Sequence, residues 1–522
     1  MSTVLDAMRR LLLGVLWTIA GIGLATSACA TTRTWDGGGS SNSGGSWQTN
    51  ANWSNDTKPA SGDVAALTDV TSGTRIVTNE ATETITQLQI TQSSSGGTNR
   101  LQFNAGLTIT GSGNDPYIVT LNAPAGTSNL VVDLNGQTVS TTLNGWKRHY
   151  LRGIWNMTTS GSGIASSSGS DSFRVYGILN LGAGATIVGA PNGDTVNLRY
   201  FENYGSVQAA GAGVSQVGVT SSGSSTVAIY HNGSETVTGA VLTVGTGSDS
   251  AEFRLRYGNA YLYNYTNNTV TVNAGAILSL YTDTAAQWDW HGTKMINFGA
   301  FNLAGKVVFR PNGWNLDVPP AAINDVDNYG TFVVSGVWAS LERQIASGAL
   351  ATYFLFGNNA GATLTGAGKL TYTNTTIQTT LNTNLVTNYG TIAPGNPTGT
   401  LELVNAAVTF TNGSKLAIQI GGTAPGTYSA LVVSRTSTTG GGNGGGGTLN
   451  LTSPGETLQV TTLPTFRKDV SNTWTVASAV ALSGTFDTPI LPDTLHWRVW
   501  YTATSVMLTY RPPPLGSMFM VR

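Results

Sequence analysis

The residues that could take part in catalysis are few and widely spaced along the chain. Its 522 residues include four histidines, which are His149, His231, His291 and His496. None belongs to an H-E-x-x-H motif, and the sequence has no G-x-S-x-G nucleophile elbow. Asp289 and His291 would share one face of a strand, but a partly buried histidine beside a surface aspartate is far more common than a catalytic pair. The sequence predicts no catalytic residues and favours a protein that is not an enzyme.

The densest acidic stretch points to a different chemistry. Asp325 and Asp327 lie two residues apart, so an extended backbone would project both carboxylates from one face. Paired carboxylates ligate calcium, or act as acid and base in polysaccharide cleavage. We predict a calcium site at these two residues, and calcium is the only cofactor that the sequence suggests. The alternative is a plain polar turn that leads into Asn328.

A third set of candidates is aromatic. Residues at even spacing project from the same side of a strand, and a row of exposed rings can stack on the faces of sugars. The alternative is that these rings fill the interior of the fold. The candidate ligand-binding residues are Tyr257, Tyr261, Tyr263, Tyr265, Trp288 and Trp290.

The composition restricts the elements that can position these side chains. Charged residues make up 10% of the chain, against about 25% in an ordinary soluble domain, and 66 residues are glycine. Such a chain is short of the strong helix formers, while its 40% of hydrophobic residues is enough for a packed core. The formal net charge of −1 argues against binding to nucleic acid or to an anionic membrane. The composition is typical of an all-β protein.

A degenerate repeat runs through the middle of the chain. Short alternating apolar segments are separated by a motif of asparagine, an aromatic residue and glycine, as in residues 203–207, 297–301, 328–332 and 388–392. Glycines at 275, 299, 330, 361, 390 and 413 lie 24, 31, 31, 29 and 23 residues apart. Repeats of about 20–50 residues are typical of solenoids and propellers. We predict a right-handed parallel β-helix over residues 66–400, with an antiparallel sandwich or propeller as the alternative.

Each residue of this motif has a physical reason to recur in such a helix. Glycine can adopt the positive φ of a sharp corner, which we expect at Gly330 and Gly390. Asparagines at equivalent turns can form hydrogen bonds from one rung to the next, and the neighbouring aromatic rings can stack.

The first thirty residues have the pattern of a signal peptide. Arg9 and Arg10 precede an apolar run over residues 11–24, and small residues before position 31 predict cleavage after Ala30. The run is shorter than the about 20 residues of a membrane span. Two alternatives are a lipoprotein signal ending at Cys29 and a twin-arginine signal. Cys29 is the only cysteine, so the cleaved chain would contain no disulfide.

Residues 31–65 contain Trp35, Trp47 and Trp53 among Gly, Ser and Asn, and predict a tryptophan-rich cap over one end of the solenoid. Residues 401–510 form a C-terminal β region with a Gly-rich insertion at 439–447, expected to act as a linker. Residues 495–510 alternate as a closing hairpin does, and residues 511–522 are predicted to be a disordered tail.

Two segments resemble one family. The opening of the predicted mature chain reads TWDGGG, then W, ANW and P..GD, and residues 392–401 read IAPGNPTGTL before the strand at 416–422 and the PGTYSALVV segment at 425–433. This is similar to exported bacterial proteins with autotransporter-associated β-strand repeats. The resemblance implies a passenger-like β-helix, which we expect to occur here without the membrane barrel of the family.

These observations predict a secreted or cell-surface structural or adhesive β-solenoid, with no membrane span after signal cleavage. Extracellular polysaccharide or cell-surface components are the expected partners, and nucleic acid is not. The alternative is a protein that binds or degrades polysaccharide on the same scaffold.

Overall fold

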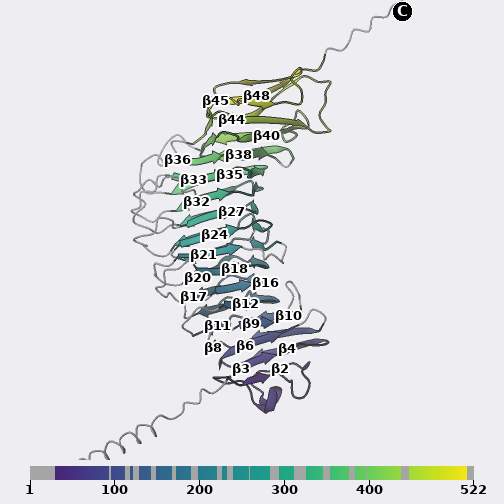
Figure 1. Cartoon of the computed structure of the whole chain (residues 1–522), viewed down its shortest axis with the longest axis vertical. Helices are drawn as coiled ribbons and strands as arrows, with labels where there is room; N and C mark the ends of the chain where they lie inside the picture. Colours follow the sequence, from purple (N-terminus) through teal and green to yellow (C-terminus); the bar gives the residue numbers. More distant parts are fainter. Residues whose placement is uncertain are drawn as a thin grey trace, which may run out of the picture.

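The chain forms one elongated solenoid built almost entirely of short strands (Figure 1). The computed structural model describes residues 30–92, 96–111, 118–121, 129–142, 148–166, 172–189, 198–219, 226–231, 239–247, 249–257, 259–282, 293–310, 325–344, 353–375, 383–395, 397–436 and 446–513. Two short 3-10 turns, η1 (Asn50–Asn52) and η2 (Ser54–Asp56), lie near its N-terminal end.

Three sheets of sixteen strands each run along the solenoid. The first sheet contains β1 (Thr32–Thr34), β3 (Val64–Leu67), β6 (Gln87–Thr91), β9 (Ile118–Leu121), β12 (Arg148–Leu151), β15 (Ser172–Val175), β18 (Leu198–Asn203), β21 (Thr226–His231), β24 (Asn259–Asn264), β27 (Thr293–Asn297), β30 (Val326–Asn328), β33 (Tyr353–Asn358), β36 (Thr383–Asn388), β39 (Ala406–Phe410), β42 (Thr448–Leu451) and β45 (Ala481–Gly484).

The second sheet contains β2 (Gly45–Ser46), β4 (Thr74–Asn79), β7 (Thr98–Phe103), β10 (Leu130–Asp133), β13 (Ile154–Met157), β16 (Ile178–Leu181), β19 (Ser206–Ala209), β22 (Val241–Val244), β25 (Thr269–Val272), β28 (Ala300–Leu303), β31 (Thr331–Val334), β34 (Thr363–Gly366), β37 (Thr391–Pro394), β40 (Lys415–Ile420), β43 (Thr457–Thr462) and β46 (Thr488–Ile490).

The third sheet contains β5 (Glu83–Ile85), β8 (Leu107–Ile109), β11 (Thr138–Thr141), β14 (Gly163–Ser166), β17 (Thr186–Gly189), β20 (Gly213–Val219), β23 (Ala251–Tyr257), β26 (Ile277–Thr282), β29 (Lys306–Arg310), β32 (Ala339–Gln344), β35 (Gly368–Thr375), β38 (Gly399–Val404), β41 (Ser429–Ser434), β44 (Asn472–Ala479), β48 (Ser505–Tyr510) and β47 (Trp497–Tyr501).

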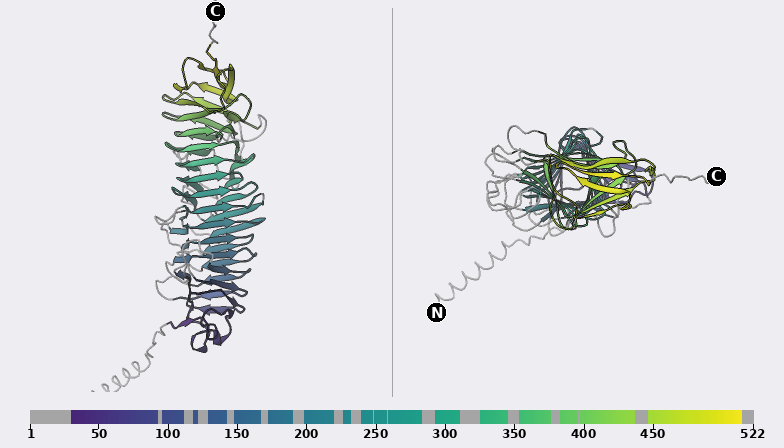
Figure 2. Two further views of the ribbon diagram at one scale, coloured as in Figure 1. Left: turned by 90° about the vertical axis from the view of Figure 1, so that its right-hand side faces the viewer. Right: turned by 90° about the horizontal axis from the view of Figure 1, so that it is seen from above.

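From β3 to β46, strands pair in parallel with the strand three positions further along the chain, so one rung uses one strand from each sheet; β1 and β2 pair in parallel with β3 and β4, and only the C-terminal strands β44, β48 and β47 pair antiparallel among the described strands. In the first sheet, for example, Asn297 is aligned with Asn328 and Asn328 with Asn358. This pairing confirms the predicted parallel β-helix and excludes an antiparallel sandwich or propeller. The sheets continue without a break past residue 400, and the rungs stack along one axis (Figure 2).

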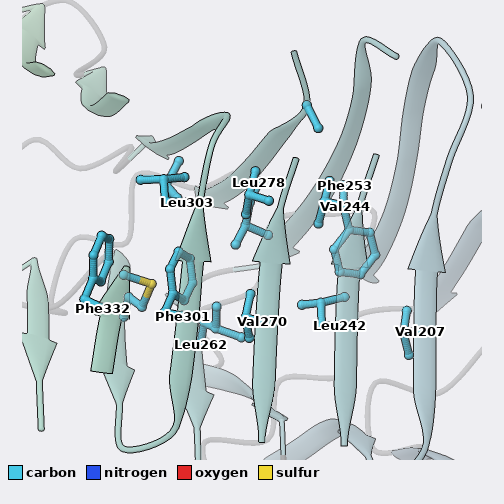
Figure 3. Close-up of a cluster of buried hydrophobic side chains, with 14 of the residues drawn as sticks. Val207, Leu242, Val244, Phe253, Leu262, Val270, Leu278, Phe301, Leu303 and Phe332 are labelled. Carbon is cyan, nitrogen blue, oxygen red and sulfur yellow. The ribbon is translucent and has the colours of Figure 1, made fainter. Parts of the chain in front are cut away.

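The core lies inside the three sheets. In most strands whose side chains are described, alternate residues point inward, and equivalent positions on successive rungs stack into columns (Figure 3). In the second sheet one such column runs from Val207 through Leu242, Val270 and Phe301 to Phe332, and all five side chains are buried. The rings of Phe301 and Phe332 stack with centroids 5.0 Å apart. This spacing is close to the distance between hydrogen-bonded strands.

An asparagine ladder follows the end of the first sheet, as the repeat predicts. Its members are Asn264, Asn297, Asn328, Asn358 and Asn388, which are all buried. In the first four members, Nδ2 donates to the Oδ1 of the next member, over distances of 2.6 to 2.8 Å. The same Nδ2 also donates to a backbone carbonyl at the start of the second sheet in the following rung. The ladder therefore satisfies buried polar groups at this corner and couples each rung to the next.

The glycines at this corner were predicted to adopt a positive φ, but two of them are required for another reason. Gly330 and Gly390 do not have positive φ. Instead their backbones pass so close to the rung below that a Cβ atom on Gly330 would lie 2.2 Å from the carbonyl oxygen of Gly299. Gly361, where the corner turn is longer, does have a positive φ of 82°. Gly275 lies at another corner, between β25 and β26, and so does not belong to the same series.

Both ends of the solenoid are closed by tryptophan. Trp53 packs edge-on against Trp35 and Trp47, with ring centroids 5.1 and 4.8 Å apart, and all three indoles are fully buried. At the other end β47 and β48 form the predicted antiparallel hairpin, which pairs with β44 and buries Trp474 and Trp497. The fold thus has the expected N-terminal cap and C-terminal β region.

The Gly-rich insertion lies mostly outside the described residues. Its last two glycines, which are described, do not behave as the predicted linker. Gly447 has a positive φ of 88° and donates its amide to Ala406 at 2.7 Å, and a Cβ on Gly446 would meet the backbone of Asn405 at 2.7 Å. Both glycines therefore form part of a tightly packed rung.

Candidate ligand-binding surface

A column of aromatic rings lies on the outside of the corner between the first and second sheets. Each ring follows an asparagine of the ladder, and the members of this aromatic column are Tyr265, Phe298, Tyr329 and Tyr389. Phe298 stacks on Tyr265 at 6.1 Å and on Tyr329 at 4.9 Å between ring centroids, with interplanar angles of 15° and 13°. The stacking that the repeat predicts is confirmed, and it occurs on the surface. In the sequence, these residues could be found from the aromatic position of the repeated motif of asparagine, an aromatic residue and glycine.

A second, shorter stack occupies the same corner closer to the N-terminus. Tyr176 and Tyr204 are parallel within 7°, with centroids 4.8 Å apart, and Arg152 lies over the ring of Tyr176 at 4.7 Å. The hydroxyl of Tyr204 donates to Glu202, which also pairs with Arg174 at 3.2 Å. Burial and the bond to Glu202 raise the pKa of Tyr204 above its ordinary range. Charged side chains therefore hold this stack in place: Arg152 contacts the ring of Tyr176, and Glu202 accepts the hydroxyl of Tyr204.

The tyrosines selected from their even spacing do not lie on one strand. Tyr257 ends β23 in the third sheet, whereas Tyr261 and Tyr263 lie on β24 in the first sheet, with Tyr265 directly after it. The expectation that all four tyrosines share one strand was wrong because the chain turns a corner between Tyr257 and Tyr261, which a period of two cannot reveal. Ligand binding at these residues stays a prediction. Tyr261, Tyr263 and Tyr265 are half-buried on the outer face, so the alternative that they fill the interior is also wrong. Trp288 and Trp290 lie outside the described residues.

The two candidate calcium ligands each lie beside a cation. Asp325 is buried, pairs with Arg343 at 3.3 Å and accepts the backbone amide of Leu355 at 2.9 Å. Burial raises the pKa of Asp325, and Arg343 opposes that shift. Asp327 pairs with Lys294 at 2.6 Å. In the part of the chain that the structure describes, no three His, Cys, Asp or Glu side chains gather as a metal site would require.

Carboxylates of the third sheet are also paired with cations. Glu342 lies 2.7 Å from Lys306, and Glu402 lies 3.6 Å from Lys369. Among the histidines, His149 is buried and stacks on Phe173 in the core.

Uncharged polar residues line the outer face of the second sheet. The column of amides and hydroxyls at equivalent positions consists of Asn156, Asn180, Gln208, Thr243, Thr271 and Asn302. Asn180 donates to Asn156 at 2.8 Å. Asn180 and Gln208 line a groove of about 470 Å³ together with small residues that include Gly182, Ala183 and Ala210. A surface of this kind offers hydrogen-bond donors and acceptors without net charge.

One buried carboxyl group in the C-terminal rungs has an unusual acidity. Glu456 lies in the turn between β42 and β43, where its Oε1 accepts the amide of Ser453 at 3.0 Å. Its Oε2 has no hydrogen-bond partner among the described residues. Burial, together with the neighbouring Asp487, raises the pKa of Glu456 from 4.5 to about 7.

We expect the rungs around Glu456 to lose stability as the pH rises from 4.5 to 7. The folded state holds this proton more tightly than the unfolded state, so the full stabilisation is present below pH 4.5 and disappears above about 7. The loss should be on the order of 3 kcal/mol. Glu456→Gln should remove it, as measured by hydrogen exchange in β43 after correction for intrinsic rates. Glu80→Gln, at an exposed carboxylate, is the control, and an unchanged pH dependence in Glu456→Gln would contradict the assignment.

No protein-family model matches the chain, and no match was found among curated proteins. Within the described residues, no helix has the length and apolar character needed to cross a membrane.

Proposed function

We propose that this protein is a secreted or cell-surface β-solenoid with a structural and adhesive role. The observation that carries the proposal is the outer surface, where uncharged amides, hydroxyls and aromatic rings repeat from rung to rung. Such a repeated surface suits a partner that is itself a repeating neutral polymer, since many weak contacts then add up along its length. The signal-peptide pattern of residues 1–30 and the resemblance to exported passenger proteins support export.

The continuous scaffold is consistent with this role. Rungs joined by parallel pairing, the asparagine ladder and two tryptophan caps form a rod whose stability is the sum of many local terms. The described acidic residues of the first and third sheets pair with lysine or arginine, as Asp325 does with Arg343. Within these two sheets, the pairing favours binding over polysaccharide cleavage, which needs a carboxyl group free to exchange its proton with the substrate.

Adsorption and turnover can be measured on the same samples. We expect the full chain to bind one or more insoluble neutral polysaccharides in a pull-down assay, without steady release of reducing ends or unsaturated products. Binding should persist in high salt, because the surface that carries it is uncharged. Sustained turnover that Asp325→Asn or Asp327→Asn abolishes would contradict the proposal and establish the enzyme alternative. Failure to adsorb to any polysaccharide tested would contradict the adhesive role.

A further inference from the structure

The aromatic column is interrupted at one rung. Asn359 occupies the position between Tyr329 and Tyr389, where the column would otherwise continue (β33 and β36 in Figure 1). The backbone amides of Asn359 and Tyr389 each donate to the ladder residue one rung below, at 2.8 and 2.7 Å, so the three corners are stacked in register. We call the space beyond the short Asn359 side chain, between the two tyrosine rings, the column gap.

An aromatic ring would fit at position 359, because the same turn holds one elsewhere. In both turns the fourth residue donates its amide to the carbonyl of the first: Ala362 to Asn359 at 3.0 Å, and Asn268 to Tyr265 at 3.1 Å. In the second of these turns, Tyr265 stacks on Phe298 of the next rung. The turn itself therefore does not block the column, and the gap results from the identity of residue 359.

The spacing of the rungs leaves room for one ring in the column gap. Adjacent strands lie about 4.7–4.9 Å apart, so two rungs separate the rings of Tyr329 and Tyr389 by roughly 9.5 Å. A flat aromatic ring in contact on both faces needs about 7–8 Å, since optimal carbon contacts are about 3.5–4.0 Å. A pyranose ring, which is thicker than an aromatic ring because of its pucker, would also fit within this separation.

The surrounding groups match the chemistry of a sugar. The side chains of Tyr329 and Tyr389 are 44% and 47% exposed, and Tyr389 contacts no other ring among the described residues. The negative ring faces attract the C–H groups of a pyranose. The Nδ2 of Asn359 is shielded from water and has no hydrogen-bond partner within the described chain, so rotation of this amide toward a sugar hydroxyl would satisfy an unmet donor.

We propose that the column gap binds one pyranose unit of a neutral polysaccharide, held between Tyr329 and Tyr389 and hydrogen-bonded by Asn359. This inference rests on the proposed adhesive function and assigns its sugar contact to one site. The chain of the polysaccharide would pass across the corner between the first and second sheets, where Thr363 and Thr391 supply hydroxyl groups on the adjacent strands.

The test fills the column gap without removing either ring. The full chain and its variants are titrated by calorimetry with cellohexaose, laminarihexaose and maltohexaose. We expect one of these to bind, and Asn359→Tyr to weaken that binding by about tenfold or more while leaving thermal stability unchanged or higher. Tyr389→Ala should weaken binding to a similar extent. Thr411→Tyr, which adds a ring on the next rung beyond Tyr389 and leaves the gap open, is the matched control and should keep the wild-type affinity.

The outcomes separate the site from the function. If Asn359→Tyr binds a hexaose as well as the wild type does, the column gap is not the site. If no hexaose binds while the chain still adsorbs to insoluble polysaccharide, the pyranose assignment also fails and the adhesive function stands. If neither soluble nor insoluble carbohydrate binds, both are contradicted.

Discussion

Trp53→Ala should destabilise the N-terminal end of the solenoid by about 3–5 kcal/mol, the range found when large buried aromatic side chains are removed. Trp53 is fully buried, contacts both other indoles of the cap and donates its Nε1 to the carbonyl of Trp47 at 2.8 Å. Removing the Trp53 indole leaves a cavity at the N-terminal end of the core. Within the described chain no further rung lies beyond the cap, so no side chains from such a rung can move in to fill the cavity. Hydrogen exchange should rise in β1, β3 and β4.

The effect should remain local, because solenoid stability is a sum of terms within rungs and between neighbours. Exchange in β30, β33 and β36 should match the wild type. Trp338→Ala is the control, since Trp338 is 73% exposed and should cost little when removed. Simultaneous loss of protection along the whole rod would show that it unfolds as one cooperative unit and would contradict the local view.

The architecture could be predicted from the sequence because the repeat places the same residue types at the same place in each rung. Asn328 and Asn388 were expected to form hydrogen bonds between turns, and the buried ladder does this. Tryptophans among glycines indicated a cap, and alternation after residue 495 indicated a hairpin. Each of these patterns lies within a short stretch of sequence. Because successive rungs stack in parallel, the same short pattern also determines which residues meet between rungs.

The candidate site was harder to predict because it depends on which residues meet across rungs. Even spacing grouped Tyr257 with Tyr261, although a corner places them in different sheets. Asp325 seemed available for calcium, but its partner Arg343 is supplied by another strand eighteen residues on. The column gap at Asn359 becomes visible only once the rungs are in register, because it is defined by the rings above and below it.

Gly330→Ala should cost about 3 kcal/mol or more, although Gly330 has a backbone conformation that any residue can adopt. The new Cβ would lie 2.2 Å from the carbonyl oxygen of Gly299 and 2.6 Å from the backbone of Phe298. Overpacking typically costs about 1–3 kcal/mol, and here the obstacle is backbone that two sheets hold in register, so it cannot rotate away as a side chain would. Protection from hydrogen exchange should fall in β28 and β31, on both sides of the corner.

Gly361→Ala is the matched control, since it makes the same chemical change at the same corner one rung further on. Gly361 has a φ of 82°, but a Cβ there would have no atom within 4 Å. The cost should be about 1 kcal/mol, which is the strain of a left-handed residue alone. A larger loss for Gly361→Ala than for Gly330→Ala would mean that backbone conformation, and not the close approach of successive rungs, determines where this solenoid requires glycine.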